Sequence, residues 1–446
     1  MEHAPVALGI SLEISPGTSF GASSDTALGT HANRPPVRTL AQDALRVAID
    51  IGSTRHRVAV GLGGKLLDEF DIDHDGPGLA DFFTRIERWE KQHATPGVAV
   101  AMEGYGGYAR PLDARVLLRG WRLYSVNNLK LARFKEIFPA PAKTDAIDAR
   151  RMLELFQLQD RVPMAKAVLQ EVAPVNAVEA QLKVLTRRRK QLVEDKKRLV
   201  MRMQADLQAV CPGLLAITGQ ADNVWFLNFL TLRTDITQLQ RVRNSTLLAV
   251  SQIGKGYAAK IKEWQAQATF GESAAFVGRM IVTDAKQLLT LRSQTMALER
   301  EIEALSAQSV MATRIKTIPG FGLICGAELA AEIGSLARFA KSDSLAMYLG
   351  TAPLDNSSGK YKGSKVSRQV NRRARDAMMI AAVQHYRAVP ASNALYEKKI
   401  AAGKTHQQAI RTVARMLAKI IYAMLKNGTD YQTPLDPAIS NSAQKH

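Results

Sequence analysis

The stretch Leu45-Arg46-Val47-Ala48-Ile49-Asp50-Ile51-Gly52-Ser53 has the pattern of an apolar β-strand that ends in an acid and a glycine turn. Two more strands are predicted before residue 73, followed by a helix over 79–91. A buried strand at 98–102 then brings Glu103 to its end, and strands alternate with helices beyond it. This order is typical of an α/β layer built on a mixed sheet.

Four acids stand where such a layer binds its ligand. Asp50 and Glu103 each end a strand, and open sheets bind ligands at the carboxyl ends of their strands. Asp145 and Asp148 lie three residues apart at the start of a predicted helix, on one helix face. Four converging carboxylates repel one another unless cations neutralise them, so a two-metal site for phosphoryl transfer accounts for them. Each acid alone could also be a turn residue, a solvated charge or a stabiliser of the helix dipole.

Composition narrows the class of protein. A chain of 446 residues, 46% of them hydrophobic, is long enough for two or three globular domains. Its formal net charge of +19 favours a polyanionic partner, nucleic acid first. A membrane surface is the competing partner, but we expect neither a spanning helix nor a signal peptide. Cys211 and Cys325, the only cysteines, exclude a disulfide framework and indicate a reducing, cytoplasmic compartment.

A long amphipathic pattern over 175–210 predicts a helix and a candidate coiled coil. A second pattern over 288–305 could return antiparallel to it, so that the two helices form a stalk of the kind that commonly serves dimerisation. Seven cations in the first pattern are candidates for phosphate contacts, since Glu194 and Asp195 are too few to balance them. The alternative is an ordinary solvated helix face. These cations are Arg187, Arg188, Arg189, Lys190, Lys196, Lys197 and Arg198.

After the stalk, a glycine-punctuated turn at 315–322 opens a predicted helix over 323–333. Helix-hairpin-helix units of this kind bind nucleic-acid backbones through N–H groups at the helix start, although a Pro-Gly turn between helices is also common without such a role. Farther on, Ser357 and Ser358 precede Gly359. A hydroxyl flanked by cations is suited to attack a phosphodiester, but Ser-Ser-Gly can equally be a plain turn. The flanking cations are Lys360, Lys362, Lys365, Arg368, Arg372 and Arg373.

The order Asp50, Glu103, Asp145, Asp148, with the phrases at 103–108 (Glu-Gly-Tyr-Gly-Gly-Tyr) and 143–150 (Lys-Thr-Asp-Ala-Ile-Asp-Ala-Arg), resembles the DEDD transposases of the insertion-sequence family numbered one hundred and ten, which includes the Piv-type DNA invertases. The resemblance implies a RuvC-like domain of the ribonuclease H fold whose metal ligands are these four acids, holding Mg²⁺ or, alternatively, Mn²⁺.

The C-terminal part resembles the transposase domain of the same family in its Ile-Pro-Gly-Phe-Gly turn, its Tyr-Leu-Gly-Thr-Ala-Pro segment and its Ser-Gly pair. The serine before the glycine is the family's nucleophile, which implies Ser358 here, and Ser357 remains the alternative. The resemblance also implies covalent phosphoserine recombination of element ends and target DNA, a composite site in a homodimer or homotetramer, and a structured guide RNA in at least some members.

The resulting expectation is an α/β domain followed by all-α parts, acting on DNA in a bacterial cytoplasm. The expected segments are a disordered leader (1–44), a RuvC-like domain (45–165), a helical stalk region (175–310), a C-terminal transposase domain (311–430) and a flexible tail (431–446). Two other functions stay open. One is a metal-dependent, structure-selective nuclease that uses water as nucleophile, and the other is a nucleic-acid-binding protein with an inactive site.

Overall fold

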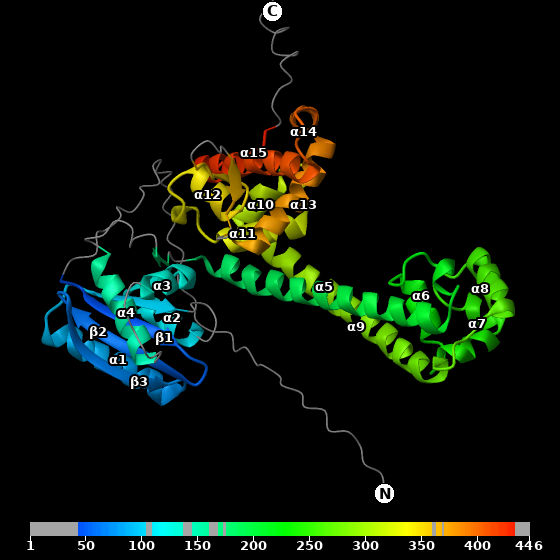
Figure 1. Cartoon of the computed structure of the whole chain (residues 1–446), viewed down its shortest axis with the longest axis horizontal. Helices are drawn as coiled ribbons and strands as arrows, with labels where there is room; N and C mark the ends of the chain where they lie inside the picture. Colours follow the sequence, from blue (N-terminus) through cyan, green and yellow to red (C-terminus); the bar gives the residue numbers. More distant parts are fainter. Residues whose placement is uncertain are drawn as a thin grey trace, which may run out of the picture.

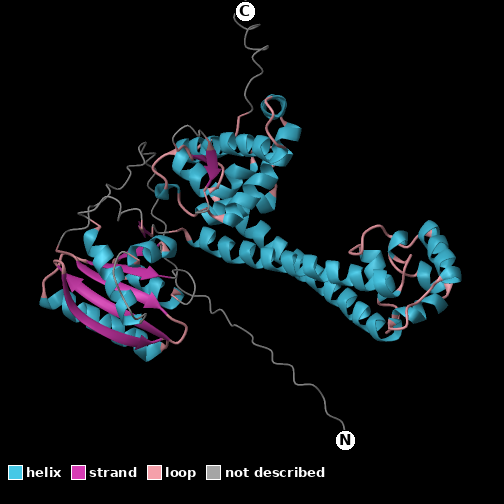
Figure 2. Ribbon diagram, viewed as in Figure 1, coloured by secondary structure: helices cyan, strands magenta, loops and turns pink. Residues whose placement is uncertain are grey.

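The computed structural model describes residues 43–103, 109–136, 145–159, 168–172, 175–358, 363–367 and 370–432. These residues form a sheet layered with helices, a long two-helix stalk, a distal bundle at the far end of the stalk and a base bundle at its near end (Figure 1). Figure 2 shows that the large sheet belongs to the first body and that the other bodies are mainly helical. The expected leader lies outside the described residues except for its last two, and one of these, Ala44, is buried, so the ordered chain begins earlier than predicted.

The first body is a six-stranded mixed sheet in the order β3-β2-β1-β4-β5-β6. Strands β1, β4 and β5 are parallel, whereas β2 and β6 run antiparallel to the strands beside them. The predicted mixed sheet is therefore confirmed, and β6 is an addition because a three-residue strand is too short to show a period. The elements are β1 (Leu45–Ile51), β2 (Arg55–Leu62), β3 (Lys65–Asp73), α1 (Gly76–Gln92), β4 (Val98–Glu103), α2 (Arg110–Leu118), β5 (Arg122–Val126), α3 (Asn128–Lys135), α4 (Asp145–Leu158) and β6 (Leu169–Glu171).

Different helices cover the two faces of this sheet. Leu45, Val47 and Ile49 of β1 belong to a core that includes buried residues of α1 and α2. Ala48 belongs to the opposite core, which is shared with α3 and α4. This second face is lined by alanines of β1, β2 and β4, whose small side chains allow α4 to pack close to the sheet. Because side chains alternate along a strand, Asp50 lies on the face that α4 covers.

Two long helices, α5 (Ala177–Val210) and α9 (Ala274–Ser306), form the stalk. Arg189 pairs with Glu299 at 2.6 Å, and Arg202 Nε donates to Asp284 Oδ2 at 2.8 Å. Partner numbers fall along α9 as they rise along α5, so the helices are antiparallel and the predicted return is confirmed. Helix α9 begins well before the predicted residue 288.

Residues 211–273 form the distal bundle, which lies within the predicted helical region 175–310 but whose individual helices the sequence did not locate. Its core includes Trp225, Phe226, Phe229 and Trp264. The helices are short, so few of them span enough turns to display a hydrophobic period. They are η2 (Leu215–Ile217), α6 (Val224–Leu230), η3 (Ile236–Arg241), α7 (Asn244–Leu248) and α8 (Lys255–Gln267).

The base bundle contains the predicted helix 323–333 with unchanged bounds. Asn371 caps the helix that follows it, because its Oδ1 accepts hydrogen bonds from the backbone N–H groups of Arg373 and Ala374. Tyr431, assigned to the flexible tail, instead donates its backbone N–H to Thr317 Oγ1 at 3.0 Å. The elements are α10 (Val310–Lys316), α11 (Leu323–Ile333), η4 (Leu336–Arg338), α12 (Ser342–Tyr348), β7 (Pro353–Asp355), β8 (Ser364–Val366), α13 (Arg372–Ala388), α14 (Pro390–Ala401) and α15 (His406–Asn427). Among the described helices, none combines the length and apolar character needed to cross a membrane.

Candidate active site

Asp50 and Glu103 lie side by side at the ends of two neighbouring strands. Strands β1 and β4 are parallel, and their register pairs Asp50 with Glu103. Both side chains are partly buried. Paired residues of adjacent parallel strands point to the same face and lie about 4.8 Å apart in backbone position. The sequence thus identified two acids that the sheet brings together.

Helix α4 carries the other two predicted acids across the same face. Its buried residues Ala149, Met152 and Phe156 pack in the core that contains Ala48. Asp148, directly before Ala149, is partly buried. Asp145 is the first residue of α4, and its side chain lies outside the described residues. The first turn of α4, which contains Asp145 and Asp148, is therefore part of the helix that packs on the same sheet face as Asp50.

Ion pairs hold α4 to the edge of the sheet. Arg150 Nη2 donates to Glu69 Oε2 of β3 at 2.7 Å, and Arg57 Nη2 of β2 donates to the same oxygen at 3.3 Å. The hydrogen bond from Arg150 lowers the pKa of Glu69, so this carboxylate stays charged at neutral pH. Arg57 is also the β2 residue paired with Asp50. The acids on β1 and α4 thus lie within a framework of charged groups that fixes the helix over the sheet.

The described side chains contain no group of three or more His, Cys, Asp or Glu arranged to hold a metal ion. Asp145, the fourth predicted ligand, is not among those side chains. Among the described residues, the strand register places Asp50 next to Glu103. The metal site of four acids remains a prediction.

Ser358 lies in the base bundle, apart from the sheet that carries the acids. It follows β7, which pairs antiparallel with β8 to form a small hairpin. The sequence predicted a loop here and missed both three-residue strands. Ser357 and Ser358 are both exposed, but the Ser357 hydroxyl donates to Asp355 Oδ1 at 2.6 Å. Lys365 is exposed on β8, whereas three other predicted cations, Lys360, Lys362 and Arg368, lie outside the described residues.

Most of the predicted cations of α5 are paired with acids. Of the seven, six form ion pairs, and four of the acids lie outside α5. Glu194 and Asp195 are too few to balance this run, as the sequence indicated, but the fold adds four acids from other elements. Contact with phosphate stays a prediction for all seven. The pairs are Arg187–Glu332, Arg189–Glu299, Lys190–Asp376, Lys196–Asp222, Lys197–Glu194 and Arg198–Asp195.

Glu332 is the member of these pairs that sequence reasoning missed. Its side chain is fully buried and accepts hydrogen bonds from Arg187 Nε at 2.7 Å and Nη2 at 3.0 Å. Asn371 Nδ2 donates to Glu332 Oε2 at 2.7 Å. Burial alone would raise the pKa of Glu332, but these hydrogen bonds and the positive charges of Arg187 and Lys183 lower it. The available signal was a pair of acids, Glu328 and Glu332, within the otherwise apolar helix 323–333.

The Pro-Gly turn at the predicted helix-hairpin-helix packs against α13. Gly320 has a φ of +88°, and a Cβ there would lie 2.5 Å from the backbone nitrogen of His385. The Pro319 carbonyl lies 2.7 Å from His385 Nδ1. Gly322, by contrast, has open space where a Cβ would stand, at the start of α11. This turn therefore has a clear packing role, and phosphate binding at α11 remains a prediction.

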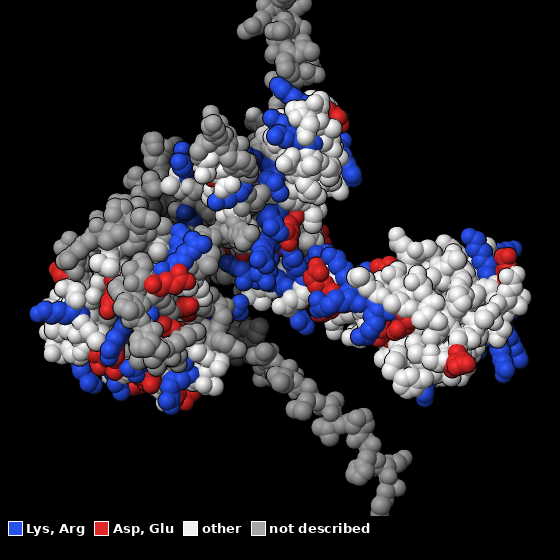
Figure 3. Space-filling view, viewed as in Figure 1, with Lys and Arg blue, Asp and Glu red and all other residues white. Residues whose placement is uncertain are grey.

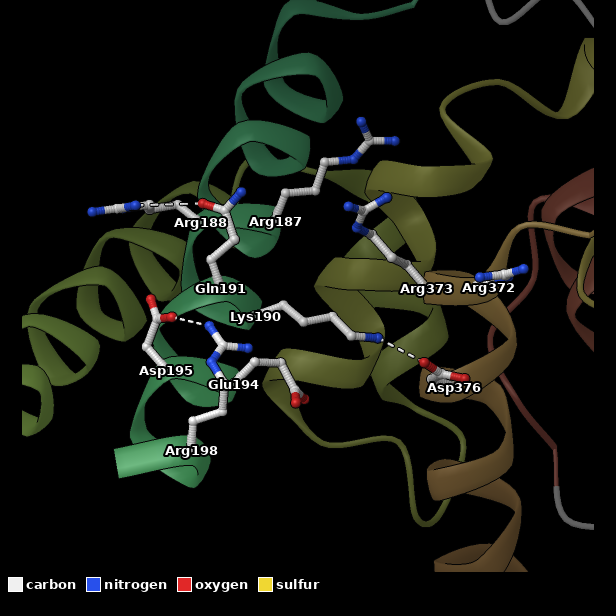
Figure 4. A pocket seen from close by; sticks show the side chains of 10 residues that line it. All are labelled: Arg187, Arg188, Lys190, Gln191, Glu194, Asp195, Arg198, Arg372, Arg373 and Asp376. Carbon is white, nitrogen blue, oxygen red and sulfur yellow. Dashed lines mark hydrogen bonds and ion pairs between the residues drawn. The ribbon is translucent and has the colours of Figure 1, made fainter. Parts of the chain in front are cut away.

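Cations gather where the stalk meets the base bundle (Figure 3). A hollow of about 640 Å³ opens there between α5 and the start of α13 (Figure 4). All ten of its lining side chains are charged or polar. They are Arg187, Arg188, Lys190, Gln191, Glu194, Asp195, Arg198, Arg372, Arg373 and Asp376.

Comparisons with known proteins identify the family of the chain. A family model described as "Transposase" matches residues 47–212, and one described as "Transposase IS116/IS110/IS902 family" matches residues 312–397. A protein of insertion element IS110 from Streptomyces coelicolor is 26% identical over 410 residues, which cover 89% of this chain and 98% of that protein. A protein of insertion element IS116 from Streptomyces clavuligerus is 27% identical over 406 residues, with the same coverage. The chain therefore belongs to the IS110 family of DEDD transposases and is a DNA transposase.

Proposed function

We propose that this transposase cuts and rejoins DNA with Ser358 as nucleophile and with four acids as ligands of Mg²⁺ or Mn²⁺, namely Asp50, Glu103, Asp145 and Asp148. The observation that carries the proposal is the register of β1 and β4, which pairs Asp50 with Glu103. Two carboxylates on one face supply the hard oxygen donors that these ions prefer. A bound divalent cation neutralises the acids and stabilises negative charge that develops on the phosphate.

The role of Ser358 follows from its hydroxyl. Its oxygen forms a bond to a DNA phosphorus as the bond from that phosphorus to one strand breaks, and the released strand end takes up a proton as a free hydroxyl. The serine proton passes to solvent. A second strand then attacks that phosphorus with its own hydroxyl, which gives its proton to solvent; the serine oxygen leaves and takes up a proton from solvent, so the strands are joined and the number of phosphoester bonds is conserved. The exposure of Ser358, which follows β7 of the β7–β8 hairpin, and of Lys365 on β8 supports this role.

The proposal includes a structured guide RNA and an assembly of two or four chains with a site shared between subunits. A net charge of +19 supports a polyanionic partner, and RNA and DNA both supply the phosphates. A shared site is tested by mixing subunits. Asp50→Asn chains and Ser358→Ala chains, each inactive alone, regain activity together if one subunit completes the site of another, and they stay inactive if each site is built from a single chain.

The chemistry is tested by incubating the protein with Mg²⁺ and the element's end DNA, with and without co-expressed RNA, and searching for covalently attached DNA after denaturation. Ser358→Ala should abolish the attached species, and the neighbouring Ser357→Ala is the matched control that should retain it. Asp50→Asn and Glu103→Gln should abolish it as well while leaving DNA binding intact.

Cleavage without an attached species, unchanged in Ser358→Ala, would rule out the serine mechanism. That result would favour a metal-dependent nuclease that uses water. Attachment lost in Ser357→Ala and retained in Ser358→Ala would move the nucleophile by one residue.

A further inference from the structure

The hollow between α5 and α13 has the surface of an anion site. Its walls contain six Arg or Lys side chains and three acids, and none of its ten lining residues is apolar. Pockets for small organic ligands and the centres of protein interfaces usually contain hydrophobic or aromatic side chains, which this lining lacks. A volume of about 640 Å³ and an open mouth leave room for consecutive phosphate groups of a polymer.

The three acids in the hollow are already neutralised within the fold. Lys197 Nζ lies 3.0 Å from Glu194 Oε1, and Arg198 pairs with Asp195. Asp376 receives Lys190 Nζ at 2.8 Å. The acids therefore do not cancel the charge of the remaining arginines.

Three arginines remain for a ligand. Arg188 on α5 and Arg372 and Arg373 at the start of α13 are exposed. Among the residues that the structure describes, none of the three has a carboxylate partner, and Arg188 makes only a long 3.4 Å hydrogen bond to Gln191. Figure 4 places Arg188 on one wall of the hollow and Arg372 and Arg373 on the other, with the Arg373 guanidinium pointing toward α5 and the other two pointing outward from the rims.

The two walls are held together by a buried network. Arg187, next to Arg188, donates two hydrogen bonds to Glu332, and Glu332 accepts a third from Asn371. The same Asn371 caps α13 directly before Arg372. The backbones that carry the three free arginines are therefore fixed relative to each other before a ligand binds, which reduces the entropy cost of binding. The N-terminal end of the 17-residue helix α13 adds partial positive charge.

We propose that this hollow is a phosphate clamp, in which Arg188, Arg372 and Arg373 bind phosphates along one nucleic-acid backbone that crosses the hollow. The planar guanidinium group donates two parallel hydrogen bonds to phosphate oxygens, which suits arginine to this role. Arg187 and Lys190 hold the walls and do not serve as the main contacts. Nucleic acid as the ligand rests on the proposed function, and DNA and RNA supply the same phosphodiester.

The test measures binding of two labelled probes, a mixed-sequence DNA duplex and an RNA duplex of the same sequence, over a range of salt concentrations. All chains carry Ser358→Ala, and EDTA is present, so neither the serine nor a metal affects the result. Arg372→Ala/Arg373→Ala is compared with Arg241→Ala/Arg279→Ala, a control that removes two exposed arginines from the distal end of the molecule.

We expect the clamp variant to raise the dissociation constant about tenfold over the control and to lower the slope of log K against log salt by about 0.9 per lost contact on DNA. Arg188→Ala, on the opposite wall, should lower the slope by about one contact independently of the α13 variant. A loss with both probes supports a clamp that accepts either polymer, and a loss with only one supports the clamp and identifies that polymer as its source of phosphate. Equal affinity and slope in the clamp variant, Arg188→Ala and the control overturn it. Because neither catalysis nor metal enters this assay, its failure is distinct from a failure of the serine chemistry.

Discussion

Replacing Arg187 by methionine should loosen the junction between the stalk and the base bundle. The substitution leaves Glu332 fully buried, with one hydrogen bond from Asn371 and Lys183 Nζ 3.9 Å away. Removing one partner of a buried ion pair costs about 3–5 kcal/mol because the other charge is left uncompensated. The Arg187 side chain is 33% exposed and Lys183 compensates in part, so we expect the lower end, about 3 kcal/mol.

The double variant Arg187→Met/Glu332→Leu separates the cost of a stranded charge from the value of the pair. Buried ion pairs replaced by apolar residues of similar size often lose little stability. The double variant should therefore be more stable than Arg187→Met alone. Two substitutions at contacting positions are expected to be non-additive in this way.

The assay is amide hydrogen exchange resolved by segment, because several separate cores make a single melting temperature ambiguous. A local loss of about 3 kcal/mol speeds exchange in α11 roughly 100-fold. Exchange in α8 of the distal bundle is the internal control and should not change. Unchanged protection of α11 in Arg187→Met, or a double variant no better protected than that single variant, would refute this account of Glu332.

Other positions give sharp expectations. The pKa of Glu332 is lowered in the folded chain, so the charged carboxylate stabilises the fold above the ordinary value near 4.5, and this stabilisation is lost as pH falls through the lowered pKa. The difference in stability between wild type and Glu332→Gln, measured by hydrogen exchange in α11, should therefore shrink on acidification. Gly278→Ala places a Cβ 2.4 Å from Asp235 Oδ1 and should cost about 1–3 kcal/mol of stability, seen as faster exchange in the distal bundle. Gly320→Ala, pressed against α13 at a φ of +88°, should be at least as costly to the base bundle. Burial raises the pKa of Cys211 to about 11, so thiol reagents at pH 8 should label it only after unfolding.

The sheet could be predicted because its information is local. The apolar run of β1 and the single acid at its end are visible within nine residues, and the same holds for β4 and Glu103. Predicting that the two acids lie next to each other required one further step, namely that β1 and β4 pair in parallel and end at the same edge of the sheet. The alternation of strands and helices in the sequence indicates this pairing. Helix 323–333 could be predicted for the same reason, because its hydrophobic period and the glycines that flank it, Gly322 and Gly334, define both of its ends.

Elements that depend on distant contacts could not be predicted. The short helices of the distal bundle are stabilised by packing around Trp225 and Trp264, not by a period of their own. Strands β7 and β8 contain three residues each and exist because they pair with each other. The candidate nucleophile, Ser358, therefore follows a strand of a hairpin that no local sequence pattern predicts. Only the chemistry of its hydroxyl and the resemblance of the C-terminal part to the transposase family pointed to this residue.

The basic run of α5 shows why charge alone does not identify a binding residue. Successive residues of a helix are turned by about 100° from each other, so neighbours in sequence face different surroundings. Arg187 faces the buried Glu332, Arg188 faces solvent at the hollow, and Arg189 faces Glu299 of α9. Because those acids lie more than 100 positions away, the three arginines are equivalent in the sequence and different in the fold. Loss of nucleic-acid binding in Arg187→Ala would therefore reflect a loosened junction as readily as a lost phosphate contact, whereas the same loss in Arg188→Ala has only the second explanation.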